Sequence, residues 1–161
     1  MKLKFAMAAG AVLLAASAKP ALAEDAAAAT PITIPMPPAG KGQIVFYRPS
    51  AMGMAMGCTV KEGETKISSV GNGKYVIVVA EPGKHEYTVH SEAKDQLTLL
   101  VEPDETQYVR CKIKMGIMSG RPDIAPSSAD DFAKSSPHLK MVHDDDMGQG
   151  ALREADLHKG G

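Results

Sequence analysis

Short extended segments separated by turns fill residues 43–115, and this rhythm restricts the fold more than any other feature. In the segment 106–115, the apolar residues Val109, Cys111 and Ile113 alternate with charged residues. Successive side chains of a strand point to opposite faces, so the alternation predicts a strand with one apolar and one charged face. The same rhythm recurs in 84–91. It predicts antiparallel sheets in which one side faces solvent.

About seven strands are expected, because turn residues recur at intervals of about ten residues. The clearest turn signals are Asn72 between two glycines and Gly63 between two glutamates, since Gly and Asn tolerate positive φ. Two antiparallel sheets that pack face to face form a β-sandwich, so the predicted class is mainly all-β. The expected strands cover 43–48, 59–61, 66–70, 75–80, 84–91, 97–101 and 106–115.

The sequence becomes irregular after Met115, with two exceptions. Ser128 followed by Asp131 resembles a capping box and predicts a short helix over 128–134. The segment 139–142 is expected to form a last edge strand.

The N-terminus has the features of a secretory signal peptide. Lys2 and Lys4 precede an apolar run from Phe5 to Ala18, and the small residues around Leu22 predict cleavage after Ala23. The run is too short to anchor the chain in a membrane, and no Cys lies near the cleavage point to carry a lipid. The sequence therefore predicts a periplasmic or secreted protein without a membrane span or lipid anchor.

Composition divides the rest of the chain into three parts. Residues 24–42 mix Ala, Pro and Gly without a period and are expected to form an extended linker. Residues 43–142 are the predicted β-sandwich domain. Residues 143–161 are rich in acids and glycines and lack an apolar stripe, so an acidic flexible tail with at most a helical turn around 151–157 is expected.

Charge and aromatic content argue against nucleic acid as a partner. Without residues 1–23, the chain carries 15 basic and 19 acidic side chains, so it lacks the positive field that phosphate backbones require. Trp is absent, and only three Phe and four Tyr are available for stacking on bases. No later apolar stretch reaches the length of a membrane span.

Several motifs, in their order, resemble a known bacterial family. They are GQIVFYRPS at 42–50, NGKY at 72–75, EPGKHEYTV at 81–89, ETQYVRCKIKMG at 105–116 and GRPDI at 120–124. The family is a domain of unknown function with the number 2846, often found on exported or lipid-anchored proteins, and the resemblance covers roughly residues 40–142. It implies a small sandwich similar to PEGA-type and prealbumin-like modules, and no established activity or site residues.

The two cysteines, Cys58 and Cys111, suit a disulfide in an exported protein. Both lie at positions expected to face the core. Two separate buried thiols remain an alternative, because Cys packs well as a small apolar residue. A redox-active pair is a third reading, although the sequence has no C-x-x-C motif.

Methionine occupies every second position at Met52, Met54 and Met56. Thioether sulfurs are soft ligands that suit monovalent copper, so these residues are the candidate metal ligands. The alternatives are that they fill irregular space at the end of the sandwich, or that the loop contacts a partner.

The histidines and the acidic C-terminal residues give weaker metal signals. His85 and His90 are an odd number of positions apart on one strand, so they face opposite ways and do not chelate together. The group His138, Met141, His143 and 144–146 is denser, but Asp-rich tails are usually solvated and the spacing matches no calcium loop.

No motif for catalysis was found, so no catalytic or cofactor-binding residue is assigned. The arginines of Arg48-Pro49 and Arg121-Pro122 are expected to pair with acids or to cap strand ends. The predicted function is an exported, non-enzymatic accessory or protein-binding module of the bacterial cell envelope, without a cofactor, monomeric or weakly associated. Its expected partner is another envelope protein. The alternative is a periplasmic protein that binds a soft metal through residues 52–56.

Overall fold

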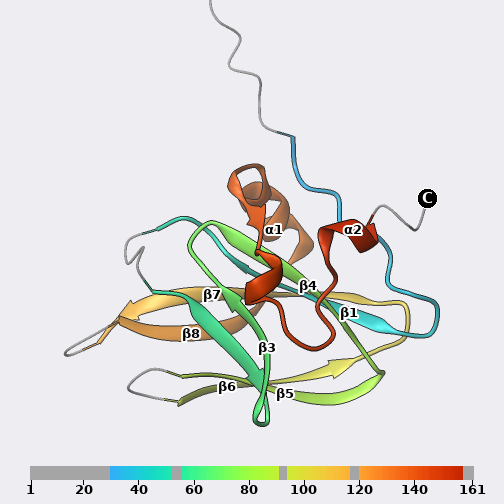
Figure 1. Cartoon of the computed structure of the whole chain (residues 1–161), viewed down its shortest axis with the longest axis horizontal. Coiled ribbons are helices and arrows are strands. Elements are labelled where there is room, and N and C mark those ends of the chain that lie inside the picture. The colour runs from blue at the N-terminus through green and yellow to red at the C-terminus, as the bar shows by residue number, and fades with distance from the viewer. Residues whose placement is uncertain (1–29, 52–55, 91–93, 117–119, 158–161) are drawn as a thin grey trace, which may run out of the picture.

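The computed structural model describes residues 30–51, 56–90, 94–116 and 120–157. Nine strands, two short α-helices and two 3-10 turns lie within these residues (Figure 1). The strands are β1 (Gly42–Arg48), β2 (Cys58–Glu62), β3 (Thr65–Val70), β4 (Lys74–Ala80), β5 (Gly83–His90), β6 (Lys94–Val101), β7 (Thr106–Met115), β8 (Gly120–Ser127) and β9 (Lys140–Met141). The helices are α1 (Ala129–Ser135) and α2 (Glu154–Leu157), and the 3-10 turns are η1 (Ser136–His138) and η2 (Asp144–Asp146).

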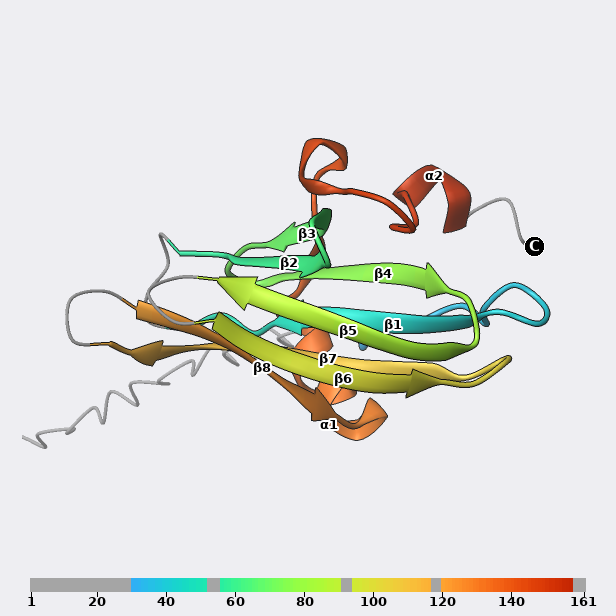
Figure 2. The same ribbon diagram turned by 90° about the horizontal axis from the view of Figure 1, so that it is seen from below.

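The strands form two sheets that face each other, which confirms the predicted β-sandwich (Figure 2). One sheet has the order β8-β7-β1-β4-β9, and the other has the order β3-β2-β5-β6. The turns at Gly63 and Gly73 have φ of 57° and 66°, the left-handed conformation that the turn signals predicted. The helix α1 begins as expected, because Ser128 caps it and its hydroxyl accepts the N–H of Asp131.

Most strand pairs are antiparallel, as predicted, but two pairs in the five-stranded sheet are parallel. β1 pairs with β4 in the antiparallel sense and with β7 in the parallel sense, and β4 also pairs in parallel with β9. Between β4 and β7 the chain passes through the other sheet as β5 and β6. That long crossover allows β7 to return beside β1 in the same direction, which a tight hairpin does not permit.

The main core lies between the two sheets. Phe46 of β1 meets Tyr87 of β5 edge-on, with ring centroids 5.1 Å apart. The alternation predicted for β7 is confirmed at its centre, where Val109 and Cys111 are buried. The fully buried aliphatic side chains around them include Ile44, Val60, Val70, Val76 and Val89.

A second apolar cluster covers the outer face of the five-stranded sheet. All seven residues of β1 are buried, so this strand has no solvated side. Phe132 of α1 packs against Tyr47, Tyr75 and Tyr108, with ring centroids 5.3, 5.9 and 5.3 Å away. The expectation of one solvated face is therefore wrong at β1 and β4, whereas the charged face of β7 is exposed at Lys112 and Lys114. The cover comes from segments whose apolar residues are isolated in the sequence, among them Ile32, Ile34, Leu139 and Leu157.

The described part of the expected linker is anchored to the sandwich. Ile32 donates its N–H to the Ser136 hydroxyl at 2.9 Å, and Pro35 accepts a hydrogen bond from the Gln43 side chain at 2.5 Å. Pro37 is buried. Residues 30–38 thus form an extended segment, as composition suggests, but one held against the outer cluster.

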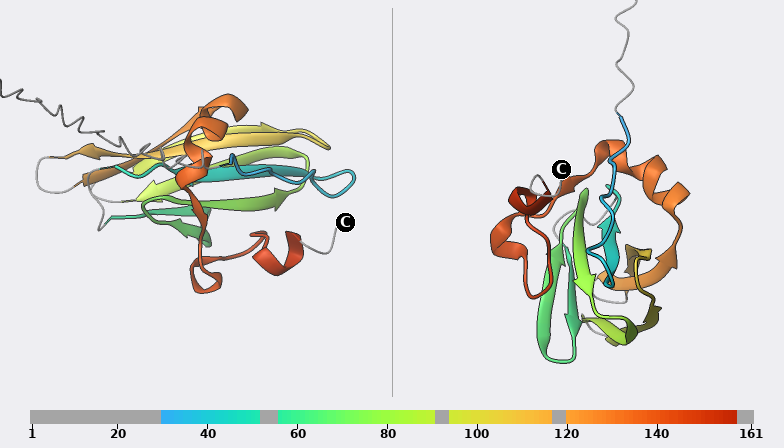
Figure 3. Two further views of the ribbon diagram at one scale, coloured as in Figure 1. Left: turned by 90° about the horizontal axis from the view of Figure 1, so that it is seen from above. Right: turned by 90° about the vertical axis from the view of Figure 1, so that its right-hand side faces the viewer.

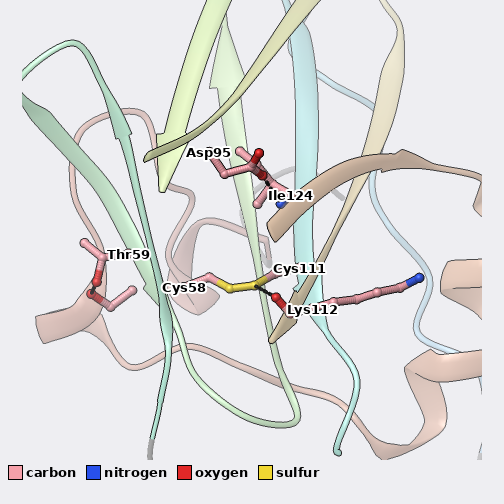
Figure 4. The surroundings of a disulfide bond; sticks show 7 residues. Cys58, Thr59, Asp95, Cys111, Lys112 and Ile124 are labelled. Carbon is pink, nitrogen blue, oxygen red and sulfur yellow. Dashed lines mark hydrogen bonds between the residues drawn. A yellow bond between two sulfur atoms is a disulfide. The ribbon is translucent and has the colours of Figure 1, made fainter. Parts of the chain in front are cut away.

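The irregular region after Met115 contains a strand that the sequence did not reveal. β8 includes Pro122 and Pro126 and pairs with β7 along its whole length. Proline is tolerated because β8 is an edge strand, where a missing N–H breaks no ladder. The N–H of Ile124 is instead donated to the Asp95 carboxylate of β6, 2.7 Å away, which ties the two sheets together on this side (Figure 4).

The opposite side of the sandwich is closed by residues 146–152, which we call the C-terminal clasp. Gly148 donates its N–H to Ile67 of β3 at 2.8 Å, and Leu152 donates to Ile77 of β4 at 2.8 Å. In Figure 3 this red segment lies beside the green strands. The acidic flexible tail expected from composition is wrong for this segment, because it binds the free edges of both sheets and packs Met147 and Ala151 against the core.

Candidate functional site

A groove of about 930 Å³ lies beside β9, and we call it the β9 groove. Segments distant in sequence build it: the residues before β1, the start of β4, β9 and the C-terminal residues up to α2. Its apolar lining residues are Ile32, Tyr75, Leu139, Met141, Val142 and Leu157. Its polar lining residues are Lys74, Lys140, His143, Asp144, Asp145 and Glu154.

Parallel pairing with β4 fixes the position of β9. Lys140 donates its N–H to Gly73, and Val142 donates its N–H to Tyr75, both at 3.0 Å. Because backbone groups alternate along a strand, the N–H of Met141 points away from β4. β9 is the last strand of its sheet, so this N–H lies on an open sheet edge.

Tyr75 is one of the residues that line the groove, and its phenol stays neutral. Its side chain is almost fully buried between the groove and Phe132. Burial, and secondly the negative charge of Glu154, raises the pKa of the Tyr75 phenol above its ordinary value. Tyr75 therefore adds no charge to the lining of the groove at physiological pH.

Charges of both signs line the groove. Lys74 lies with its Nζ 3.5 Å from the carbonyl of Met141 and 3.5 Å from Nε2 of His143. Asp144 already has a partner, because its Oδ2 lies 3.2 Å from Nη1 of Arg153. The groove can thus hold an apolar chain segment and pair polar groups at its edges.

The histidines and acids singled out in the sequence do not converge. His85 is fully engaged: its Nδ1 lies 2.6 Å from the Glu62 carboxylate, and its Nε2 lies 2.8 Å from the Glu81 carbonyl. Its ring stacks on Tyr87 at 6.0 Å. The side chain of His90 lies outside the described structure. No group of three His, Cys, Asp or Glu side chains in the described ranges is placed to hold a metal ion.

The acidic run 144–146 is used in ion pairs. Asp146 lies 4.0 Å from Lys66 of β3, and Asp144 binds Arg153. His138 is exposed at the other end of the short segment that contains β9. The pair between Asp146 and Lys66 links the C-terminal segment to β3, whereas the pair between Asp144 and Arg153 lies within that segment.

The predicted disulfide between Cys58 and Cys111 is present and joins the two sheets (Figure 4). Cys58 begins β2 and Cys111 lies in the middle of β7, with Cα atoms 6.5 Å apart. Both residues are buried in the main core. A buried bridge between facing sheets is a structural bond rather than an accessible redox pair.

The Met-rich loop is described only at its last residue. Met52 and Met54 lie outside the described residues. Met56 is half-buried, and a Cβ built on Gly120 would lie 2.7 Å from its sulfur. Gly120 in turn pairs with Met115, whose side chain is 93% exposed. Two methionines therefore lie at the same end of the sandwich.

Comparison with known proteins gives one match. The family model described as a protein of unknown function, DUF2846, matches residues 38–123. The chain belongs to the DUF2846 family. No curated protein and no solved structure matches the chain.

The DUF2846 match covers most of the sandwich but few of the residues that line the β9 groove. It contains β1 to β7 and half of β8, with both cysteines. The β9 groove is built mostly from residues beyond the match, and only Lys74 and Tyr75 lie within it. One part of this groove was predicted from the sequence, since β9 lies within the edge strand expected at 139–142. The groove itself depends on the folded C-terminal segment, which composition did not predict.

Proposed function

We propose that this DUF2846 protein is an exported, non-enzymatic binding module of the bacterial cell envelope. Its β9 groove would hold an extended segment of a partner protein. The single observation that carries this proposal is an apolar groove that runs beside an open sheet edge.

Three properties of the β9 groove support a polypeptide as its occupant. The outward N–H of Met141 offers the main-chain hydrogen bond by which an added strand is held. Tyr75, Leu139 and Leu157 provide apolar surface for alternate side chains of that strand. Lys140 and Glu154, which also line the groove, suit a segment with charges of both signs.

Export is supported by residues 1–23 and by the disulfide. Lys2 and Lys4, the apolar run and the small residues before Glu24 form the pattern of a cleaved signal peptide. A buried bridge between Cys58 and Cys111 suits an oxidising compartment. Fractionation of cells that express the full chain tests this point. Recovery outside the cytoplasm with Glu24 as the first residue supports export, and an uncleaved cytoplasmic chain contradicts it.

Site-specific cross-linking tests the groove. A photo-cross-linking amino acid replaces Met141 in one variant and Leu100 in a matched control. Leu100 is 64% exposed on β6, in the other sheet. We expect the Met141 position to cross-link to one extended segment of an envelope protein, identified by mass spectrometry. Equal cross-linking at both positions, or none at Met141, would contradict the proposal.

A soft-metal protein is a second candidate, favoured by the position of Met56 beside Gly120 and opposite the exposed Met115. Two thioethers at one end of the sandwich can contribute soft ligands, together with Met52 and Met54. Titration with silver or reduced copper distinguishes this candidate from the binding module. The wild type is compared with a variant in which residues 52, 54 and 56 are changed to leucine. Equal and negligible uptake by both removes this candidate.

A further inference from the structure

The outer face of the β7–β8 pair carries a row of positive side chains. Arg110, Lys112 and Lys114 alternate along β7, so all three lie on one face of the sheet. Arg121 of β8 lies opposite Lys114 in the antiparallel ladder, and residues that lie opposite each other share a face. We call the surface formed by Arg110, Lys112, Lys114 and Arg121 the basic face.

The basic face points away from the main core. Tyr47, which belongs to the outer cluster, lies opposite Arg110 in the parallel pairing of β1 with β7. The helix α1 packs on Tyr108, near the start of β7. Further along the strand, Lys112 and Lys114 are exposed to solvent. In Figure 4 the side chain of Lys112 points away from the disulfide that joins the two sheets. The basic face is therefore accessible to a partner.

Acidic side chains neutralise little of this positive charge. β7 contains no acid, and β8 contains only Asp123. Asp123 lies opposite Lys112 in the ladder, but its carboxylate binds Lys114. The ion pairs between described residues do not include Arg110, Lys112 or Arg121. Most of the positive charge of the basic face is thus left without an acidic partner in the described part of the chain.

Opposite charges lie at the two edges of the five-stranded sheet. β7 and β8 lie at one edge, and β9 lies at the other. The residues after β9 are acidic, with aspartate at 144, 145 and 146. The chain from residue 24 onward carries 15 basic and 19 acidic side chains, so an even distribution would be repelled by an anionic surface. The separation of charge instead orients the protein with its basic face toward such a surface.

An exposed apolar side chain lies at the end of the same strands. Met115 is the last residue of β7, directly after Lys114, and it is 93% exposed. Figure 2 shows this end of β7 and β8 at the left-hand limit of the strands. The binding of a protein to an anionic bilayer strengthens with the apolar area that it inserts and with the basic side chains near the lipid headgroups. This end of the sandwich supplies both.

We propose that the basic face binds the surface of an anionic lipid bilayer, with Met115 inserted among the lipid headgroups. The ammonium and guanidinium groups would pair with lipid phosphates, and a sheet face can present several of them to one surface. An acidic polypeptide also complements the charge, but the bilayer is favoured because it takes up the exposed Met115 as well. The basic face lies at the edge of the sheet opposite the β9 groove, so the proposal does not depend on peptide binding in that groove.

Sedimentation with lipid vesicles tests the proposal. Vesicles that contain phosphatidylglycerol are compared with vesicles of phosphatidylcholine alone, at low and at high salt. The chain from Glu24 onward is used, because every described strand and helix lies after this residue and an apolar N-terminus would itself enter the bilayer. We expect binding to the anionic vesicles only, and its loss at high salt, where charges are screened. Absence of binding to the anionic vesicles at low salt would overturn the proposal.

Charge variants locate the contact on the protein. Lys112→Gln should weaken vesicle binding by about fivefold, the contribution of one basic side chain near an anionic bilayer. Asp123→Asn should strengthen binding, because it removes the only acid of β8. Lys84→Gln is the matched control, since it removes an equal charge at an exposed position of β5 and should leave binding unchanged. An unfolding curve confirms that each variant is folded. Equal weakening by Lys112→Gln and Lys84→Gln would show that the basic face is not the contact.

Met115→Ser and polyglutamate distinguish a bilayer from an acidic polypeptide. The substitution should weaken binding to the anionic vesicles, because it removes the inserted apolar side chain while all four charges of the basic face remain. Polyglutamate is the probe for an acidic polypeptide. Binding of polyglutamate without binding to the vesicles, or vesicle binding that Met115→Ser leaves unchanged, would contradict the proposal.

Discussion

Val79 of β4 donates its backbone N–H to the carbonyl of Gly150, 2.9 Å away, and so holds the C-terminal clasp to the edge of the five-stranded sheet. Two residues earlier, Gly148 binds Ile67 of β3 in the other sheet. The clasp therefore spans the open side of the sandwich and covers two strand edges. Exposed edges invite pairing with other chains, so this closure shields these two strand edges from edge-to-edge association.

Gly148→Ala should loosen the clasp. A Cβ at this position would lie 2.0 Å from the carbonyl oxygen of Lys66, a backbone atom that has little freedom to move. We expect a loss of about 1–3 kcal/mol in the free energy of unfolding, measured by urea titration. Gly71→Ala is the matched control, since a Cβ there meets only the Lys74 side chain at 3.6 Å. Equal effects of the two substitutions would contradict a specific role for the clasp.

Removal of the disulfide should destabilise the sandwich strongly. The bridge between Cys58 and Cys111 closes a loop across 53 residues, for which the chain-entropy model gives about 4 kcal/mol. A Cys58→Ala/Cys111→Ala double variant is compared with the oxidised wild type in urea. The reduced wild type should resemble the double variant. A difference below about 1 kcal/mol would show that packing, rather than the bridge, joins the two sheets.

Stability should fall in alkaline solution. Burial, and secondly the charge of Glu62, raises the pKa of the Tyr87 phenol, and burial raises the pKa of Tyr108. A folded-state pKa above the unfolded value stabilises the fold below the unfolded pKa of about 10, and this contribution is lost as the pH rises above it. Urea unfolding between about pH 9 and 11 measures the loss. Tyr87→Phe should reduce the slope, and an unchanged slope would contradict the assignment to Tyr87.

Local pattern was sufficient to predict the elements whose signals lie within a few residues. The bounds of β7 were predicted from its alternation of apolar and charged residues. The turn at Gly73 was predicted because glycine tolerates positive φ, and the start of α1 was predicted from the capping residue Ser128. The disulfide was also predicted, because the parity of Cys58 and Cys111 in their strands directs both toward the core.

The features that were not predicted depend on contacts between distant segments. Pro122 and Pro126 argue against a strand unless it is known to lie at an edge, which only the sheet order reveals. Phe132 is an isolated apolar residue in polar surroundings, and Ile32 lies in a proline-rich segment without a helical or strand pattern, so no periodicity marks the outer cluster that they share. The β9 groove also joins distant segments, and of its parts only the edge strand at 139–142 had a local signal.

Phe132 is the residue on which the outer cluster depends, because its ring contacts three tyrosines from three different strands. Phe132→Ala should lower the free energy of unfolding by about 3–5 kcal/mol, the usual cost of removing a buried aromatic ring. It should also weaken cross-linking at Met141, since Tyr75 lines the β9 groove and rests on this ring. Ser128→Ala, which removes only the cap of the same helix, should cost about 1 kcal/mol. If the two variants lose equal stability, α1 is held by its own backbone rather than by packing of its single buried side chain on the sheet.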